Sequence, residues 1–212
     1  MPITTLFWDN DGVLVDTEHL YFEATAEILR GIGIPLTEQD YVQLFLIEGR
    51  GAWHLAAERG WAAPELERLR EARNALYGRR LAEQAEAIPG VEGVLDKLRG
   101  RYRMGVVTSS RRDHFDIIHA RTGLARYFDF ILTAGDFPRV KPHPDPYLAA
   151  LARSGAAAAE CLAIEDSARG LAAAKAAGIR CLVVPTALTR GCTFTGAERV
   201  LSSIEDVLTV LS

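Results

Sequence analysis

The stretch TLFWDNDG, residues Thr5–Gly12, decides the fold of this 212-residue chain. Its first four residues form an apolar run that is too short for a helix and does not alternate, which predicts a strand buried on both faces. Asp9 and Asp11 follow at the end of that strand, and Gly12 allows the chain to turn. Because ligands bind beyond the carboxyl ends of strands in open parallel sheets, both carboxylates are predicted to face a functional site.

Four similar apolar runs occur later in the chain, at Met104–Val107, Phe130–Leu132, Cys161–Ile164 and Cys181–Val184. Predicted helices alternate with these strands, at Val91–Arg99, Arg111–Thr122, Asp145–Ser154 and Ser167–Ala177, and a glycine follows each helix. Alternating strands and helices favour a parallel sheet covered on both faces. We therefore expect a doubly wound, Rossmann-like α/β fold.

A purely helical segment interrupts this pattern between the first and second strands. Thr37 and Asp40 have the spacing of a capping box, and Pro64 suits the first turn of a long last helix. We predict an α/β core domain at residues 1–16 and 88–212 and a small helical cap domain at residues 17–87.

Composition excludes several classes of function. The chain has 24 Lys and Arg against 28 Asp and Glu, a net charge of −4, and no basic tract, which argues against nucleic-acid or anionic-membrane binding. The N-terminal residues lack the basic and apolar regions of a signal peptide, and no apolar run is long enough to span a membrane. The three cysteines have no metal-binding spacing. We expect a soluble cytoplasmic protein that acts on small molecules.

Polar residues follow four of the predicted strands. Asp9 and Asp11 follow the first, Thr108 the second, Lys141 lies in the loop after the third, and Glu165 with Asp166 follows the fourth. Taken singly, each segment also has a purely structural explanation, as a turn, a helix cap or a proline-rich connection. Together they provide carboxylates, a hydroxyl and an ammonium group at one sheet edge, which are the components of a Mg²⁺-assisted phosphoryl-transfer site.

These segments, in this order, resemble the four motifs of the haloacid dehalogenase superfamily: FWDNDGVLVDTE from Phe7, VVTSS from Val106, VKPHPD from Val140, and IEDS from Ile164 with Gly170. The resemblance covers essentially the whole chain, including a helical cap between the first two strands. This arrangement is similar to the branch that contains β-phosphoglucomutase and the phosphoglycolate and sugar-phosphate phosphatases.

The resemblance implies a role for each matching residue. Asp9 would be the nucleophile that forms an aspartyl-phosphate, and Asp11 the general acid and base. Thr108 and Lys141 would hold the phosphoryl oxygens. Mg²⁺ would be bound by Asp9, the backbone carbonyl of Asp11, Asp166 and Glu165. Because an alkoxide needs a proton to leave and a halide does not, the presence of Asp11 favours phosphoryl transfer over dehalogenation.

Substrate recognition is assigned to Ser109, Ser110 and three cap residues, Glu18, Tyr21 and Arg50. Arg50 lies between two glycines on a predicted loop, which makes it the best polar anchor for a substrate. Tyr21 aligns with a histidine that helps the mutases deprotonate a sugar hydroxyl, and this difference favours a phosphatase.

Two alternatives stay open: a mutase of the β-phosphoglucomutase type, and a non-catalytic regulatory module that binds a phosphorylated ligand. The predicted partner is a small phosphorylated metabolite, and the chain is expected to be a monomer or a weak homodimer.

Overall fold

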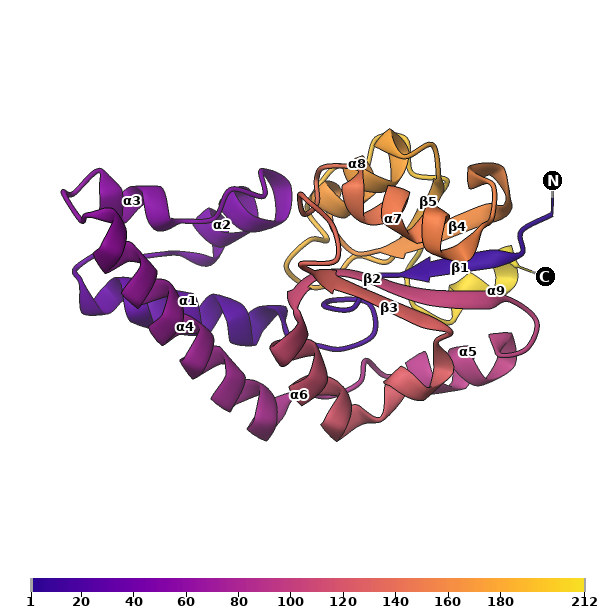
Figure 1. Ribbon diagram of the computed structural model, residues 1–212, viewed down its shortest axis with the longest axis horizontal. Helices are drawn as coiled ribbons and strands as arrows, with labels where there is room; N and C mark the ends of the chain where they lie inside the picture. Colours follow the sequence, from indigo (N-terminus) through magenta and orange to yellow (C-terminus); the bar gives the residue numbers. More distant parts are fainter. Residues whose placement is uncertain (1, 212) are drawn as a thin grey trace.

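The computed structural model describes residues 2–211. Within them, six parallel strands form one sheet in the order β3-β2-β1-β4-β5-β6 (Figure 1). The strands are β1 (Thr5–Trp8), β2 (Arg103–Arg111), β3 (Phe130–Ala134), β4 (Cys161–Glu165), β5 (Arg180–Val183) and β6 (Arg199–Val200). The strand order steps outward in both directions from β1. The predicted doubly wound α/β fold is confirmed.

Helices cover both faces of the sheet (Figure 1). Leu6 and Trp8 face one hydrophobic cluster, which they share with α5 (Val91–Leu98), α6 (Arg112–Thr122) and α9 (Asp206–Val210). Phe7 points to the other face, into a cluster with α7 (Asp145–Ser154) and α8 (Ala168–Ala176). Short 3₁₀ turns, η2 (Leu124–Tyr127) and η3 (Ala158–Glu160), precede β3 and β4. Because both faces are covered, β1 and β4 are buried along their whole length.

The segment between β1 and β2 contains α1 (Glu18–Gly31), α2 (Glu38–Tyr41), the π-helical turn η1 (Val42–Ile47), α3 (Trp53–Ala57) and α4 (Ala63–Gln84). The side chains of Thr37 and Asp40 form the expected capping box at α2. These helices pack around a cluster of their own that includes Leu29 and Leu46. In Figure 1 they lie beyond the arrowheads of the strands, and α4 contacts α6 of the core while η1 contacts α8. We call α1 to α4 the cap; its division from the core at residues 17 and 87 stays a prediction.

Two differences from the predicted strands bear on the site. Strand β2 continues to Arg111, and its pairing with β3 shifts register between Val107 and Arg111. This irregularity falls on Thr108, Ser109 and Ser110. Strand β6 has only two residues, an arginine and a valine, so it lacks the apolar run from which a strand can be predicted.

Among residues 2–211, no helix combines the length and the apolar character needed to cross a membrane.

Candidate active site

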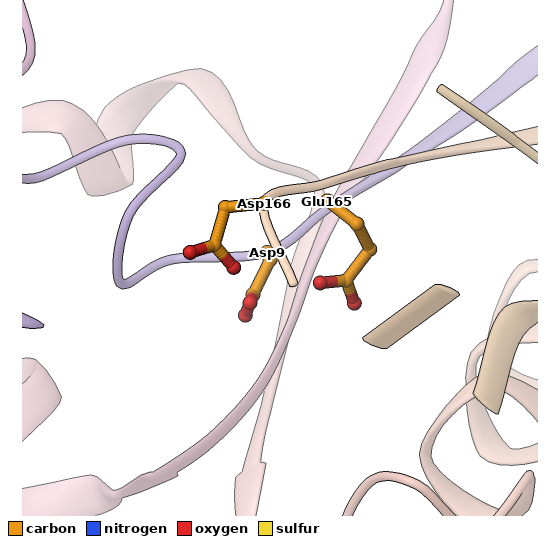
Figure 2. A group of neighbouring side chains, drawn as sticks. All are labelled: Asp9, Glu165 and Asp166. Atoms are coloured by element: carbon orange, nitrogen blue, oxygen red, sulfur yellow. The ribbon is translucent and has the colours of Figure 1, made fainter. Parts of the chain in front are cut away.

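Three carboxylates meet at the carboxyl ends of β1 and β4 (Figure 2). Asp9 follows the last residue of β1, Glu165 is the last residue of β4, and Asp166 comes next in the chain. One carboxylate oxygen from each residue lies within 4.8 Å of the other two, and all three side chains are buried. The parallel pairing of β1 with β4, Trp8 opposite Ile164, produces this convergence.

Lys141 is the cation within this acidic group. Its side chain is only 1% exposed, and Nζ lies 2.9 Å from Asp9 Oδ1 and 2.6 Å from Glu165 Oε1. Nζ also donates a hydrogen bond of 2.7 Å to the carbonyl oxygen of Val107, in the middle of β2. Burial by itself would lower the pKa of Lys141, but the Asp9 and Glu165 carboxylates raise it above its ordinary value. Lys141 is therefore a permanently charged ammonium group beside Asp9.

One ammonium group does not balance three buried carboxylates. Burial, followed by repulsion from Glu165, raises the pKa of Asp9 to about 8. Burial and the neighbouring charges of Glu18 and Asp9 hold the pKa of Asp166 well above its ordinary value. Carboxylates in this arrangement stay ionised at neutral pH only with a further cation between them.

The chemistry of the unused oxygens fits such a cation. Within residues 2–211, Asp166 Oδ2 and Glu165 Oε2 are buried without a hydrogen-bond partner. Gly12, at φ +81°, lies so close that a Cβ atom there would be 2.5 Å from Asp166 Oδ2. Hard carboxylate oxygens are the ligands that Mg²⁺ prefers. The donor set of Asp9, Asp166 and Glu165 therefore fits Mg²⁺, and Glu165 also pairs with Lys141.

Asp11 lies apart from this group and is surrounded by hydroxyl donors. Thr17 Oγ1 donates to Asp11 Oδ1 at 2.6 Å, and Ser110 Oγ donates to Oδ2 at 2.5 Å. The hydroxyls of Thr108 and Tyr77 lie at 3.4 Å from Asp11 Oδ2 and Oδ1, respectively. Because these donors come from the cap linker, the cap and the last part of β2, Asp11 lies where the two parts of the molecule meet.

A cavity of about 210 Å³ opens above both aspartates. Asp9, Asp11 and Lys141 line it from the core, together with the three consecutive hydroxyl residues Thr108, Ser109 and Ser110. Glu18 and Tyr21 line it from the cap. The structure therefore brings together nearly all of the predicted site residues. Asp166 and Glu165 lie behind the wall of the cavity rather than on it.

Arg50 is the exception among the predicted substrate-binding residues. It lines a different cavity, formed by cap residues alone, and its guanidinium pairs with the neighbouring Glu48. The Arg50 side chain is 53% exposed. Of the two glycines that flank it, Gly49 lies beside Pro142 and Gly51 beside Phe45. Arg50, the expected anchor for a substrate, is therefore not among the residues that line the cavity at Asp9 and Asp11.

Arg73 and Arg169 line the cavity and were not predicted from the sequence. Arg73 is only 6% exposed and lies over the Tyr21 ring at 4.3 Å. Its helix, α4, is so rich in Glu and Arg that the sequence indicates a solvated surface. Arg169 reaches from α8 to 4.0 Å from Glu18 Oε1, and Tyr41 donates a hydrogen bond to Oε2 of the same glutamate. The sequence does not show which of the many charged residues of a helix is buried, so Arg73 is identified only by the packing of α4.

Comparison with known proteins now adds to this geometry. The profile of a family described as haloacid dehalogenase-like hydrolase matches residues 6–184, most of the chain. The chain belongs to the haloacid dehalogenase-like hydrolases. Within this family it is 31% identical over 210 residues to protein CbbY of Rhodobacter capsulatus, covering 93% of this chain and 92% of that one. It is 30% identical to the phosphorylated carbohydrates phosphatase of Thermotoga maritima, covering 97% of both chains.

A solved structure of this haloacid dehalogenase-like family is closely similar in fold. CbbY from Rhodobacter sphaeroides in complex with phosphate superimposes with a TM-score of 0.83 at 27% identity, covering 97% of this chain and 96% of that one. A mutant of the same protein was solved with xylulose-1,5-bisphosphate, with a TM-score of 0.82. The family match and the phosphatase-named relatives, among them the protein from Thermotoga maritima, place the chain among the phosphoric monoester hydrolases.

Proposed function

We propose that this hydrolase is a Mg²⁺-dependent phosphatase that cleaves a small phosphomonoester, a sugar phosphate or a phosphoglycolate-like compound, through an aspartyl-phosphate. One observation carries the proposal. Asp9, paired with Lys141 and grouped with two further buried carboxylates, lies in the floor of a small cavity that also contains a second aspartate, Asp11.

Asp9 is the nucleophile in this proposal. Lys141, at 2.9 Å, keeps one Asp9 oxygen oriented, and the backbone N–H of Asn10 donates to the same oxygen, Oδ1, at 2.8 Å. The second oxygen is left to attack phosphorus in line with the leaving group. The bond from phosphorus to the substrate oxygen breaks as the new bond to Asp9 forms. Lys141 and the Thr108 hydroxyl stabilise the charge that develops on the phosphoryl oxygens.

Asp11 moves the proton. As a carboxylic acid it protonates the departing alkoxide, and as a carboxylate it then accepts a proton from the water that hydrolyses the aspartyl-phosphate. The hydroxyls around it accept or donate as its charge changes, so both states keep hydrogen bonds. Mg²⁺ bound to Asp9, Asp166 and the Asp11 carbonyl, with Glu165 beside it, would neutralise negative charge on the phosphoryl group.

The size and charge of the cavity support a small anionic substrate. About 210 Å³ holds a phosphoryl group with a few carbon and oxygen atoms, and is tight for a nucleotide. Arg73 and Arg169 add positive charge at its cap and core walls. The curated relative from Thermotoga maritima is named as a phosphatase of phosphorylated carbohydrates, and the second CbbY structure contains a sugar bisphosphate. These names support the proposed substrate class.

Phosphate release from a panel of small phosphomonoesters tests the proposal. The panel contains glucose phosphates, fructose 1-phosphate, phosphoglycolate and p-nitrophenyl phosphate, each with Mg²⁺ and with EDTA. We expect turnover that requires Mg²⁺ and is abolished in Asp9→Asn. Asp11→Asn should accumulate a covalent adduct one phosphoryl group heavier than the protein, detected by intact mass spectrometry.

Asp16→Asn is the matched control, because Asp16 lies in the same segment but its side chain is 66% exposed. This variant should keep near wild-type activity. Conversion of β-glucose 1-phosphate without phosphate release would replace the phosphatase with the mutase. Well-folded protein that releases phosphate from no substrate would support the non-catalytic phospho-ligand module instead.

A further inference from the structure

A chain of buried polar side chains runs from α6 to Asp11. Asn10, between the two aspartates, is completely buried, and its amide oxygen lies 2.8 Å from His119 Nε2. The Asn10 amide nitrogen donates to Asp11 Oδ2 at 3.3 Å. On the far side of the imidazole, His119 Nδ1 lies 3.2 Å from the hydroxyl of Thr122. Nothing in the proposed chemistry uses His119 directly.

Only one arrangement of protons satisfies every hydrogen bond of this chain. The Asn10 nitrogen donates to Asp11 Oδ2, so the Asn10 oxygen faces His119 and requires a donor there. His119 must therefore carry its proton on Nε2 and accept from Thr122 at Nδ1. Burial lowers the pKa of His119 to about 4, which keeps the ring neutral, and the hydrogen bonds at its two nitrogens select this tautomer.

The backbone of Asn10 ties the same chain to the catalytic loop. Its N–H donates to Asp9 Oδ1, and its carbonyl oxygen accepts from the N–H groups of Val13, Leu14 and Val15. The orientation of this one residue thus bears on both aspartates. The His119 ring is itself held against Phe115, at 4.1 Å between ring centroids.

We propose that His119 and Asn10 are a positioning pair for Asp11, in which His119 fixes the Asn10 amide and the amide holds the Asp11 carboxyl group on the leaving-group side of the site. The inference rests on the proposed role of Asp11 as general acid. Without His119, the Asn10 amide loses the partner that sets its orientation, and Asp11 donates its proton from a less well-defined place.

Leaving groups of different basicity test this role. p-Nitrophenolate leaves without a proton, whereas the more basic phenolate of phenyl phosphate is helped by one, and the two substrates differ by a single nitro group. The quantity to measure is kcat/KM, which reports aspartyl-phosphate formation. We expect His119→Leu to lower kcat/KM roughly tenfold for phenyl phosphate and less than threefold for p-nitrophenyl phosphate. His119→Gln, whose amide provides an N–H donor, should recover most of the loss.

Two further variants keep the test decisive if His119→Leu does not fold. Asn10→Leu should show the same selective loss, and Thr122→Val a smaller one in the same direction. Ile118→Val, on the same helix and outside the chain of hydrogen bonds, should leave the ratio of the kcat/KM values for the two substrates unchanged. Equal losses for both substrates in the folded variants would overturn the inference and make His119 a structural residue.

Asp11→Asn separates this inference from the proposed function. If Asp11→Asn selectively loses kcat/KM for phenyl phosphate while the His119 variants keep the wild-type ratio of the two kcat/KM values, the positioning pair is rejected and Asp11 remains the general acid. If Asp11→Asn itself keeps the wild-type ratio, the proposed role of Asp11 is rejected.

Discussion

Replacing Lys141 with methionine should destabilise the protein in a way that depends on pH and Mg²⁺. Methionine keeps most of the volume of the lysine side chain but removes its charge. Three contacts of Nζ are lost, to Asp9, Glu165 and the Val107 carbonyl, all in a place where the side chain is 1% exposed. Removing one partner of a buried ion pair costs about 3–5 kcal/mol, because the other charge is left unpaired.

The sign of the pH dependence follows from the carboxylates. The pKa of Lys141 is raised in the folded protein, so its contribution is fully present below the unfolded value of 10.5 and is lost only as pH rises beyond that. Without Lys141, which lowers the pKa of Asp9, Asp9 holds its proton to still higher pH. The folded variant then binds more protons than the folded wild type, and the loss of unfolding free energy grows with pH. We expect the unfolding free energy to fall by about 3 kcal/mol near pH 6 and by roughly 1 kcal/mol more at pH 8.5.

Urea unfolding in EDTA at both pH values, repeated with saturating Mg²⁺, measures these differences. Mg²⁺ should reduce the loss, since the cation replaces part of the missing charge. Lys175→Met is the control: Lys175 is exposed on α8 and donates to the Thr195 carbonyl, so its loss should stay within about 0.5 kcal/mol. A loss below 1 kcal/mol for Lys141→Met, or an equal loss at both pH values, would refute the reasoning.

Three other predictions follow from burial and charge. Because the pKa of Asp9 is raised to about 8, the metal-free protein loses stability as pH rises from about 4 to 8, and Mg²⁺ should raise the Tm more at pH 8 than at pH 5; an equal gain would contradict the carboxylate site. The pKa of His119 is lowered from 6.5 to about 4, so its contribution to the unfolding free energy is present above pH 6.5 and is lost as pH falls toward 4. Between pH 7 and pH 4 or below, the unfolding free energy of the wild type should therefore fall by about 3 kcal/mol more than that of His119→Gln. Arg73→Met should raise KM for the best anionic substrate about tenfold and Arg50→Met less than twofold, and the reverse order would show that Arg50 reaches the substrate.

The core of the site followed from the sequence for a geometric reason. Asp9, Thr108 and Glu165 each come at the end of a short apolar run, and parallel strands bring such ends to one edge of the sheet whatever the details of packing. The fold class and the convergence of those residues on one cavity could therefore be predicted from the apolar runs and the order of the polar segments.

Tertiary structure alone decided which cap residues face that edge. The sequence favours Arg50 over Arg73, but the Arg73 guanidinium packs on Tyr21 in the cavity and the Arg50 guanidinium pairs with Glu48 at the surface. Likewise, no local pattern joins Asn10 to His119, which is 109 residues away in the chain. Helix periodicity fixes which residues share a face, but the angle at which one helix packs on another decides what that face meets. Sequence therefore determined the chemistry at the strand ends, and packing between distant helices determined the rest of the site.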